Sequence, residues 1–127
     1  MAEYSVIGKS IPRVDALGKV TGEAVYSTDL YLPGILVGKI KRSPYPFARI
    51  LSINTNKASK LPGVKAVITA QNVVQFPFGV AIKDELPLAD TYVRYAGEAV
   101  VAVAASDADI ADKALDLIEV EYEECIS

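Results

Sequence analysis

The chain has 127 residues, is 51% hydrophobic and carries a formal charge of −3, values typical of one domain that buries roughly two-thirds of its unfolded surface. It has no histidine and one cysteine, Cys125, which excludes a histidine-based catalytic triad and argues against a cysteine protease, a zinc site and a disulfide scaffold. Lysines and arginines are scattered rather than clustered for nucleic acid, and nothing near Met1 is typical of a signal peptide or membrane anchor, so we expect a cytoplasmic protein.

The first half of the chain predicts strands separated by turns. Gly8–Gly22 mixes proline, glycine and polar residues and predicts an ordered arm or a series of turns rather than a long element. Ala24–Tyr26 has the composition of a short edge strand, and Ile35–Arg42 alternates well enough for a full strand. Two prolines in Ser43–Phe47 predict that the chain leaves the sheet there and crosses to a new strand at Ala48–Ile53.

A short helix and a long excursion are predicted for the middle of the chain. Asn54 or Thr55 can cap a helix that runs to Lys60, where a Pro-Gly pair stops it. Val64–Thr69 is typical of a strand. Asn72–Asp90 has little periodicity and contains two prolines and a glycine, which predicts a long loop with two phenylalanines, Phe76 and Phe78, as anchors.

The clearest pattern in the chain is a strand, a helix and a second strand. Ala99–Ala105 is apolar at every position, which predicts a strand buried on both faces. Ser106 fits an N-cap with Asp109 completing a capping box, and apolar residues at helical spacing predict a helix over Asp107–Leu117. Ile118–Glu123 then alternates as a half-buried strand. The order of elements predicts an α/β or α+β fold.

Few residues fit a chemical role by themselves. Four acids cluster near the C-terminal end and fit solvated edge charges better than a paired-carboxylate hydrolase: Glu119, Glu121, Glu123 and Glu124. Glu98 is either a buried acid of a site or a paired turn residue. Three arginines fit either an anion site or pairing with neighbouring acids: Arg42, Arg49 and Arg94.

A series of short motifs occurs along nearly the whole chain. The motifs are Arg13, Asp15, Lys19 and Gly22, then Tyr26 and Asp29, Pro33-Gly34 and Leu36, Arg42-Ser43-Pro44, Ala48-Arg49-Ile50, Leu61-Pro62-Gly63-Val64, Pro87-Leu88-Ala89, Val93-Arg94-Tyr95, Gly97-Glu98 and the strand after it. Together they resemble the N-terminal α/β hammerhead domain of the molybdenum-binding large subunit of the xanthine dehydrogenase and aldehyde oxidase family. Phe47 and Ala99 depart from the family pattern, which usually shows histidine and proline there.

The resemblance implies a single α/β hammerhead domain over residues 1–127, with a mixed sheet and two helices, as a fragment of a longer subunit. No catalytic, cofactor-binding or metal residue is implied for this chain. The residues implied to be structural or to lie at an interface are Arg13, Asp15, Lys19, Gly22, Tyr26, Asp29, Arg42, Ser43, Pro44, Phe47, Phe76, Phe78, Gly97 and Glu98.

The resemblance also implies a function for the parent subunit. It would be a molybdopterin-dependent oxidoreductase that hydroxylates aldehydes, aromatic N-heterocycles or related compounds, or an aromatic acyl-CoA reductase, with this chain inactive alone. Iron-sulfur and FAD groups are implied on partner subunits or domains. We expect Phe47, Phe76 and Phe78 to pack on the remaining domains of the subunit or on the iron-sulfur or flavin subunit, with no nucleic acid or membrane as partner. The alternative for Phe76 and Phe78 is that both rings fold back onto the sheet of this domain. The alternative is a free-standing, non-catalytic binding or assembly module of the same fold.

Overall fold

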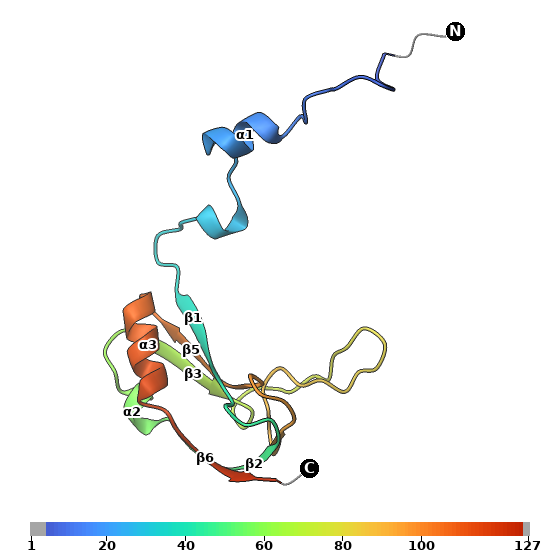
Figure 1. The fold of residues 1–127 in the computed structure, drawn as a ribbon. Coiled ribbons are helices and arrows are strands. Elements are labelled where there is room, and N and C mark those ends of the chain that lie inside the picture. The colour runs from blue at the N-terminus through green and yellow to red at the C-terminus, as the bar shows by residue number, and fades with distance from the viewer. Residues whose placement is uncertain (1–4, 126–127) are drawn as a thin grey trace. The chain divides into compact units, whose positions relative to one another are not determined.

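The computed structural model describes residues 5–125, which divide into two units at Pro33 and Gly34. The first unit, called the arm below, is described over residues 5–33 and contains helix α1 (Ala16–Thr21) and a 3-10 turn (Ser27–Asp29). The second unit, called the sheet unit, is described over residues 34–125 and holds the strands and helices α2 and α3 (Figure 1). That one domain spans residues 1–127 stays a prediction, and its ends at 1–4 and 126–127 lie outside the described residues.

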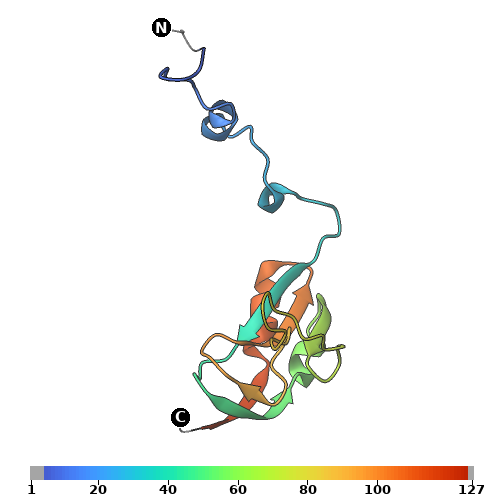
Figure 2. The ribbon, with the colours of Figure 1, turned by 90° about the vertical axis from the view of Figure 1, so that its right-hand side faces the viewer.

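Two three-stranded antiparallel sheets form the sheet unit. The first, sheet A, has the order β1-β5-β3, with β1 at Val37–Arg42, β3 at Val64–Thr69 and β5 at Ala99–Ala105. Figure 2 shows β1 and β5 side by side, in a register that pairs Val37 with Ala105. Its central strand, β5, therefore forms hydrogen bonds on both edges.

The second sheet, sheet B, has the order β4-β2-β6. Strand β2 (Ala48–Asn54) lies between the two-residue strand β4 (Tyr92–Val93) and β6 (Glu119–Glu124). Along the chain, successive strands alternate between the two sheets, since β1, β3 and β5 form sheet A and β2, β4 and β6 form sheet B. Every connection between strands of the sheet unit therefore passes from one sheet to the other.

The predicted α/β (α+β) fold class is confirmed, but the prediction of a mixed sheet is wrong. A mixed sheet needs a parallel pair, and all strand pairs among residues 5–125 are antiparallel. A helix between two strands normally links parallel neighbours in one sheet. Here α2 (Asn56–Ser59) links β2 to β3, and α3 (Ala108–Asp116) links β5 to β6, so each helix connects strands of different sheets.

Strand β5 supplies the centre of the core with the predicted bounds. Val101, Val103 and Ala105 alternate onto one face and are fully or almost fully buried. On the other face Val100 is buried, whereas Ala102 and Ala104 are half-buried, so the prediction of burial on both faces holds only in part. Helix α3 packs across sheet A and turns its buried alanines inward: Ala111 and Ala114. Their small side chains let the helix approach the sheet closely.

Asp107, and not Ser106, is the N-cap of α3. Its carboxylate Oδ1 accepts the Ile110 backbone N–H at 2.8 Å. The predicted cap at Ser106 is wrong, since the Ser106 hydroxyl donates to Asp107 Oδ2 at 3.3 Å rather than accepting a helix N–H. The Ser106 N–H donates to Gly63 O at 2.9 Å in the turn that leaves the strand. A helix beginning near Ser106 is confirmed, and it ends at Asp116.

The arm differs from the sequence prediction at two places. The six-residue helix α1 lies where an ordered arm or a series of turns was expected, and Ala24–Tyr26 is not a strand. The N–H of Ala24 donates to Gly18 O at 2.9 Å, and the N–H of Tyr26 donates to Asp29 Oδ2 at 3.0 Å. These donors are bound within the arm, so they do not form a strand ladder.

The bounds of the remaining helices and strands agree with the sequence predictions to within a few residues. Strand β1 begins at Val37 rather than Ile35, and α2 is a single turn whose Asn56 N–H donates to the Asn54 side chain at 3.1 Å. Residues 70–91 form the predicted excursion, in which Phe78 and Glu85 make a two-residue bridge. No helix among residues 5–125 is both long enough and apolar enough to cross a membrane.

Replacing Gly63 by alanine is expected to destabilise the sheet unit more than the same change at Gly97. Both glycines have a positive φ, +94° and +93°, so the backbone strain is matched. A Cβ at Gly63 would lie 2.5 Å from Ile110 Cδ1, whereas a Cβ at Gly97 meets no atom within 4 Å. The two nearest atoms, Ile110 Cδ1 and Ser106 Oγ, are ends of side chains that can shift. Urea unfolding should therefore show an extra loss of about 0.5–1.5 kcal/mol for G63A, the cost of a displaced side chain; equal losses would contradict the close approach.

The two candidate caps of α3 can be separated by alanine substitution. Asp107→Ala should lower the free energy of unfolding by about 1 kcal/mol because the Ile110 N–H loses its acceptor. Ser106→Ala should cost less than about 0.5 kcal/mol, since the Ser106 hydroxyl makes only an exposed 3.3 Å bond to Asp107. Asp107→Ser, which keeps a capping oxygen, is the control and should retain most of the stability. A larger loss for S106A than for D107A would reverse the assignment.

Candidate functional site

The motifs Arg42-Ser43 and Gly97-Glu98 meet where β1 ends and β5 begins. The Ser43 N–H donates to Glu98 O at 2.9 Å, and the Gly97 N–H donates to Ser43 O at 2.8 Å. Arg42 Nη1 donates to Gly97 O at 2.8 Å. These bonds tie the segment that leaves sheet A to the segment that returns to it, and the residues Arg42, Ser43, Gly97 and Glu98 are called the Ser43–Glu98 clasp below.

The carboxylate of Glu98 completes the clasp. Glu98 is only 7% exposed, and its Oε2 accepts the Arg94 backbone N–H at 2.5 Å. The guanidinium of Arg94 lies 3.8 Å from the other carboxylate oxygen. Of the two interpretations of Glu98, the paired turn residue is therefore confirmed, since hydrogen bonding offsets the cost of burying its carboxylate. Arg94 likewise pairs with a neighbouring acid, as isolated arginines often do.

A cavity of about 520 Å³ adjoins the clasp within the sheet unit. Arg42, Arg94 and Glu98 line it together with residues of the long excursion, among them Phe78, Glu85 and Leu86. Two arginines face three acids across this lining, because Asp84 also contributes to it. The cavity is therefore a mixed polar and apolar hollow, and its positive charges are balanced by carboxylates.

The three phenylalanines expected at an interface keep much of their surface in solvent. Phe47 is 36% exposed, Phe76 72% and Phe78 49%. Phe47 stacks on Tyr92 with ring centroids 6.0 Å apart and planes 17° apart. Exposure of this kind is a condition for an interface, but the interface itself stays a prediction. Pro44 is also exposed.

Ser43 also organises the chain toward sheet B. Its Oγ accepts the Tyr45 N–H at 3.0 Å, which turns the proline-rich connection between β1 and β2. The Tyr45 ring packs on Tyr122 of β6, with centroids 5.2 Å apart. Burial raises the pKa of the Tyr122 phenol above its ordinary value, a hydrogen bond with Ser43 opposes the shift, and the neighbouring Tyr45 adds to it. The clasp and this tyrosine pair thus connect both sheets.

In the arm, the first motif residues hold helix α1. The carboxylate of Asp15 pairs with Lys19 at 2.6 Å and with the guanidinium of Arg13. These two cations, Lys19 first and then Arg13, hold the pKa of Asp15 below its ordinary value. Gly22 ends the helix with φ of +78°, the left-handed conformation that favours glycine at a helix end.

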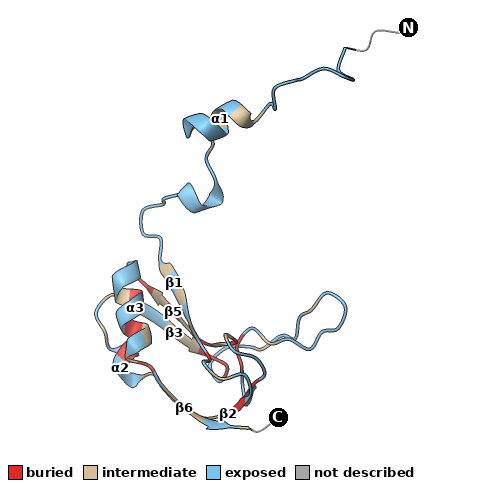
Figure 3. Cartoon of the chain, in the orientation of Figure 1, coloured by how far each residue is buried: buried red, intermediate tan, exposed pale blue. Residues whose placement is uncertain are grey.

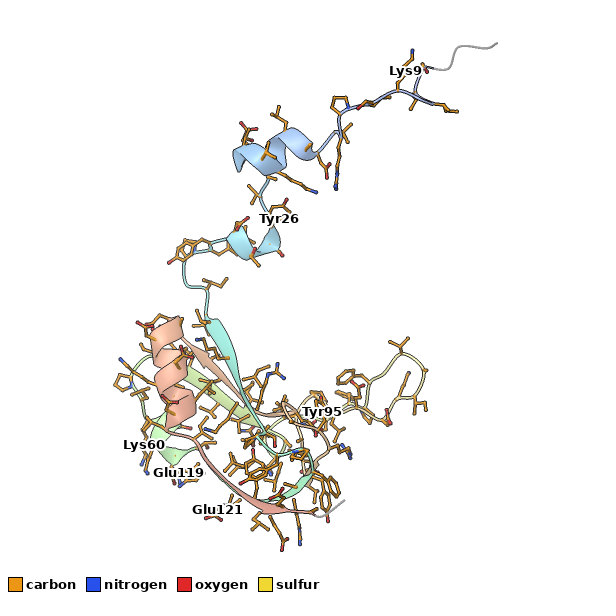
Figure 4. The ribbon with its side chains drawn as sticks, viewed as in Figure 1. Lys9, Tyr26, Lys60, Tyr95, Glu119 and Glu121 are labelled. Carbon is orange, nitrogen blue, oxygen red and sulfur yellow. The ribbon has the colours of Figure 1, made fainter. Side chains whose placement is uncertain are left out.

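Tyr26 and Asp29 form the second turn of the arm. The Asp29 side chain accepts the Tyr26 N–H at 3.0 Å, and the Asp29 N–H donates to Tyr26 O at 3.0 Å. Figure 4 labels Tyr26 at this 3-10 turn. These motif residues of the arm therefore act on the conformation of the arm itself.

The acidic cluster on β6 is a set of solvated edge charges, as predicted. Figure 4 labels Glu119 and Glu121 on this strand. Lys57 Nζ lies 2.6 Å from Glu119 and holds the pKa of that carboxyl below its ordinary value, and the Ser52 hydroxyl donates to Glu121 at 2.8 Å. No three acids or other ligand residues within residues 5–125 gather as a metal site.

The sequence analysis did not identify several residues that lie near the clasp, the cavity or the end of β3. Tyr92 stacks on Phe47, and Asp84 and Glu85 line the cavity, because the excursion folds back toward the clasp. Asn72 closes the end of β3, where its side chain accepts the Thr69 N–H at 2.8 Å and donates to Val67 O at 3.1 Å. An asparagine three residues after a strand residue fits such a turn, and only that local signal was available.

Curated relatives match most of the chain. It is 51% identical over 113 residues to a probable subunit of xanthine dehydrogenase from Bacillus subtilis (strain 168), covering 88% of this chain and 15% of that protein. It is 42% identical over 123 residues to the nicotinate dehydrogenase large molybdopterin subunit of Eubacterium barkeri, covering 96% and 29%. The chain thus spans less than a third of the length of these two relatives.

Solved structures of related enzymes also match most of the chain. A reconstituted CO dehydrogenase from Oligotropha carboxidovorans superposes with a TM-score of 0.84 at 37% identity, covering 93% of this chain and 15% of that one. Quinoline 2-oxidoreductase from Pseudomonas putida 86 gives a TM-score of 0.82 at 36% identity, covering 94% and 16%. Residues 21–125 match the family described as "Aldehyde oxidase and xanthine dehydrogenase, a/b hammerhead domain", and the chain belongs to this family.

Proposed function

We propose that this chain is the N-terminal structural and assembly domain of the molybdenum-binding subunit of a molybdopterin-dependent oxidoreductase. The parent enzyme would hydroxylate an aldehyde, an aromatic N-heterocycle or a related compound, or reduce an aromatic acyl-CoA. The observation that carries the proposal is a match over most of this chain that spans only a small part of each relative. We infer a single domain over residues 1–127, belonging to a longer subunit.

The side chains of the candidate site support a structural role. The clasp residues form hydrogen bonds with one another, Glu98 forms an ion pair with Arg94, and no described side chains form a metal-ligand set. The cofactor would be held by the rest of the subunit, and its redox chemistry would belong there.

The partners form a second part of the proposal. Besides the rest of the molybdenum subunit, we propose iron-sulfur and FAD-containing subunits or domains as neighbours. The names of several relatives, such as "large molybdopterin subunit" and "large chain", describe parts of multi-subunit enzymes and support this assembly. We further propose a cytoplasmic location, because the single cysteine makes no disulfide and cytoplasmic proteins rarely contain them.

The alternative function is a free-standing binding or assembly module with the same fold. The reading frame downstream of Ser127 distinguishes the two. A frame that continues into several hundred further residues supports the subunit, and a stop codon directly after Ser127 supports the module.

Molybdenum content tests the proposed division of labour. The purified 127-residue chain should contain no stoichiometric molybdenum and show no turnover with aldehydes or N-heterocycles, because the part of the subunit proposed to hold the cofactor is missing from it. The subunit encoded by the whole frame, expressed in the same host, is the control and should contain about one molybdenum per chain. Elemental analysis measures both. Stoichiometric molybdenum on the short chain would contradict the assignment.

The phenylalanines of the excursion provide a test of the interface. Phe76→Ala with Phe78→Ala should weaken assembly of the whole enzyme on the order of tenfold or more if these rings are interface anchors. The 127-residue chain should keep its stability, since both rings are about half or more exposed. Phe76→Leu with Phe78→Leu, which keeps apolar groups, is the control. Unchanged assembly of the alanine variant in a sedimentation experiment would remove these residues from the interface with a separate iron-sulfur or flavin subunit.

A further inference from the structure

The arm exposes almost all of its apolar side chains. None of residues 5–33 is buried (Figure 3). Leu17 is 70% exposed and Val20 82%, and several other large apolar residues of the arm are at least half exposed: Val6, Ile7, Ile11, Val14, Val25, Tyr26, Leu30, Tyr31 and Leu32. Single exposed apolar residues are ordinary, but a contiguous set along one segment indicates a binding surface.

Polar residues of the arm form contacts within the arm. Asp15 and Lys19, four residues apart, pair on one side of α1, and Asp29 folds back onto the Tyr26 N–H. Leu17 and Val20, three residues apart, lie on another side of the same helix. The polar groups thus shape the arm, while the apolar groups remain available. The set Val14, Leu17, Val20, Val25, Leu30 and Tyr31 is called the arm ridge below.

Helix α1 has six residues and no buried residue. Isolated helices of this length are marginal in water, because nucleation is costly and few hydrogen bonds follow it. The Gly22 cap and the Asp15 ion pairs favour the helix, but packing of an apolar face supplies most of the stability of such short elements. The arm therefore has a defined local conformation that depends on an external apolar surface.

We infer that the arm ridge docks into an apolar groove on the part of the same polypeptide that follows Ser127 in the parent subunit. This inference rests on the proposed function, because it requires the longer subunit. The chain spans only 15% of the xanthine dehydrogenase relative, so most of the surface that such a subunit can offer lies in the remainder. A tethered groove also has a high effective concentration, which favours it over a separate molecule.

The net charge of the arm also limits which surface the arm ridge can bind. Residues 5–33 carry three cations, Lys9, Arg13 and Lys19, and three acids, Asp15, Glu23 and Asp29. The arm is therefore formally neutral, and two of its cations are already paired with Asp15. A strongly charged partner gains little from such a segment, whereas an apolar groove buries the ridge without leaving a charge unpaired.

Limited trypsin digestion can test the docking in the whole subunit, with the 127-residue chain as reference. In the short chain, cleavage after Arg13 and Lys19 should be fast, since Arg13 is exposed and no arm residue is buried. In the parent subunit the same cleavages should be about 100-fold slower, because docking closes the segment to protease. Equal rates in a molybdenum-containing subunit would overturn the inference and leave the proposed function intact.

Two substitutions at one ridge position make the test specific. In the parent subunit, Leu17→Asp should restore cleavage after Arg13 by at least about tenfold, and Leu17→Met, which keeps an apolar side chain, should not. In the 127-residue chain neither change should alter the melting temperature, because Leu17 is exposed. Each variant is compared with itself in the two proteins, which cancels any direct effect of the new side chain on trypsin.

Three other outcomes would assign the ridge to a different occupant and overturn the inference. Protection in the short chain that is independent of its concentration would place the arm on the sheet unit. Protection that rises with concentration would indicate a second copy of the chain. Protection of the parent subunit only after a separate iron-sulfur or flavin subunit is added would place the groove on that subunit. A parent subunit without molybdenum would instead contradict the proposed function.

Discussion

The sheet unit depends on the backbone hydrogen bonds between Ser43 and the Gly97-Glu98 turn. Each strand connection passes from one sheet to the other, so the two sheets need a fixed junction. The segment that leaves β1 and the segment that enters β5 are joined at this point by hydrogen bonds of 2.8 and 2.9 Å. The buried carboxylate of Glu98 binds the N–H of Arg94 and so fixes the chain that returns from β4.

The core that this junction supports is made of small side chains. Its largest fully buried residues are four valines, Val93, Val100, Val101 and Val103, and alanines fill the contacts around them. Small residues allow the two sheets and α3 to approach closely, but they bury little apolar area per residue. Larger apolar residues, such as Phe76 and Tyr31, stay on the outside. A domain built in this way has much of its apolar surface available for the rest of a larger subunit.

The family motifs of this chain determine the local conformation of the backbone. In the arm they form the Asp15 ion pairs, the Gly22 helix end and the Asp29 turn. In the sheet unit they form the clasp. None of these groups is arranged as a nucleophile with a base, and each has its hydrogen-bonding capacity directed at a neighbouring segment. These polar residues therefore fix the local shape of each unit.

Local sequence patterns determined the elements that depend on neighbouring residues. The apolar run Ala99–Ala105, the amphipathic helix after it and the alternation in β6 each predicted an element close to its observed bounds. Only the tertiary structure decided which strands pair, because pairing depends on contacts between residues far apart in sequence, and each helix links two different sheets. It also decided the turn before α3, where the Ser106 N–H donates to Gly63 O, far away in the sequence. The tie between Ser43 and Glu98 was equally open, because the two residues are far apart in the sequence and only the fold brings the Ser43 N–H to Glu98 O.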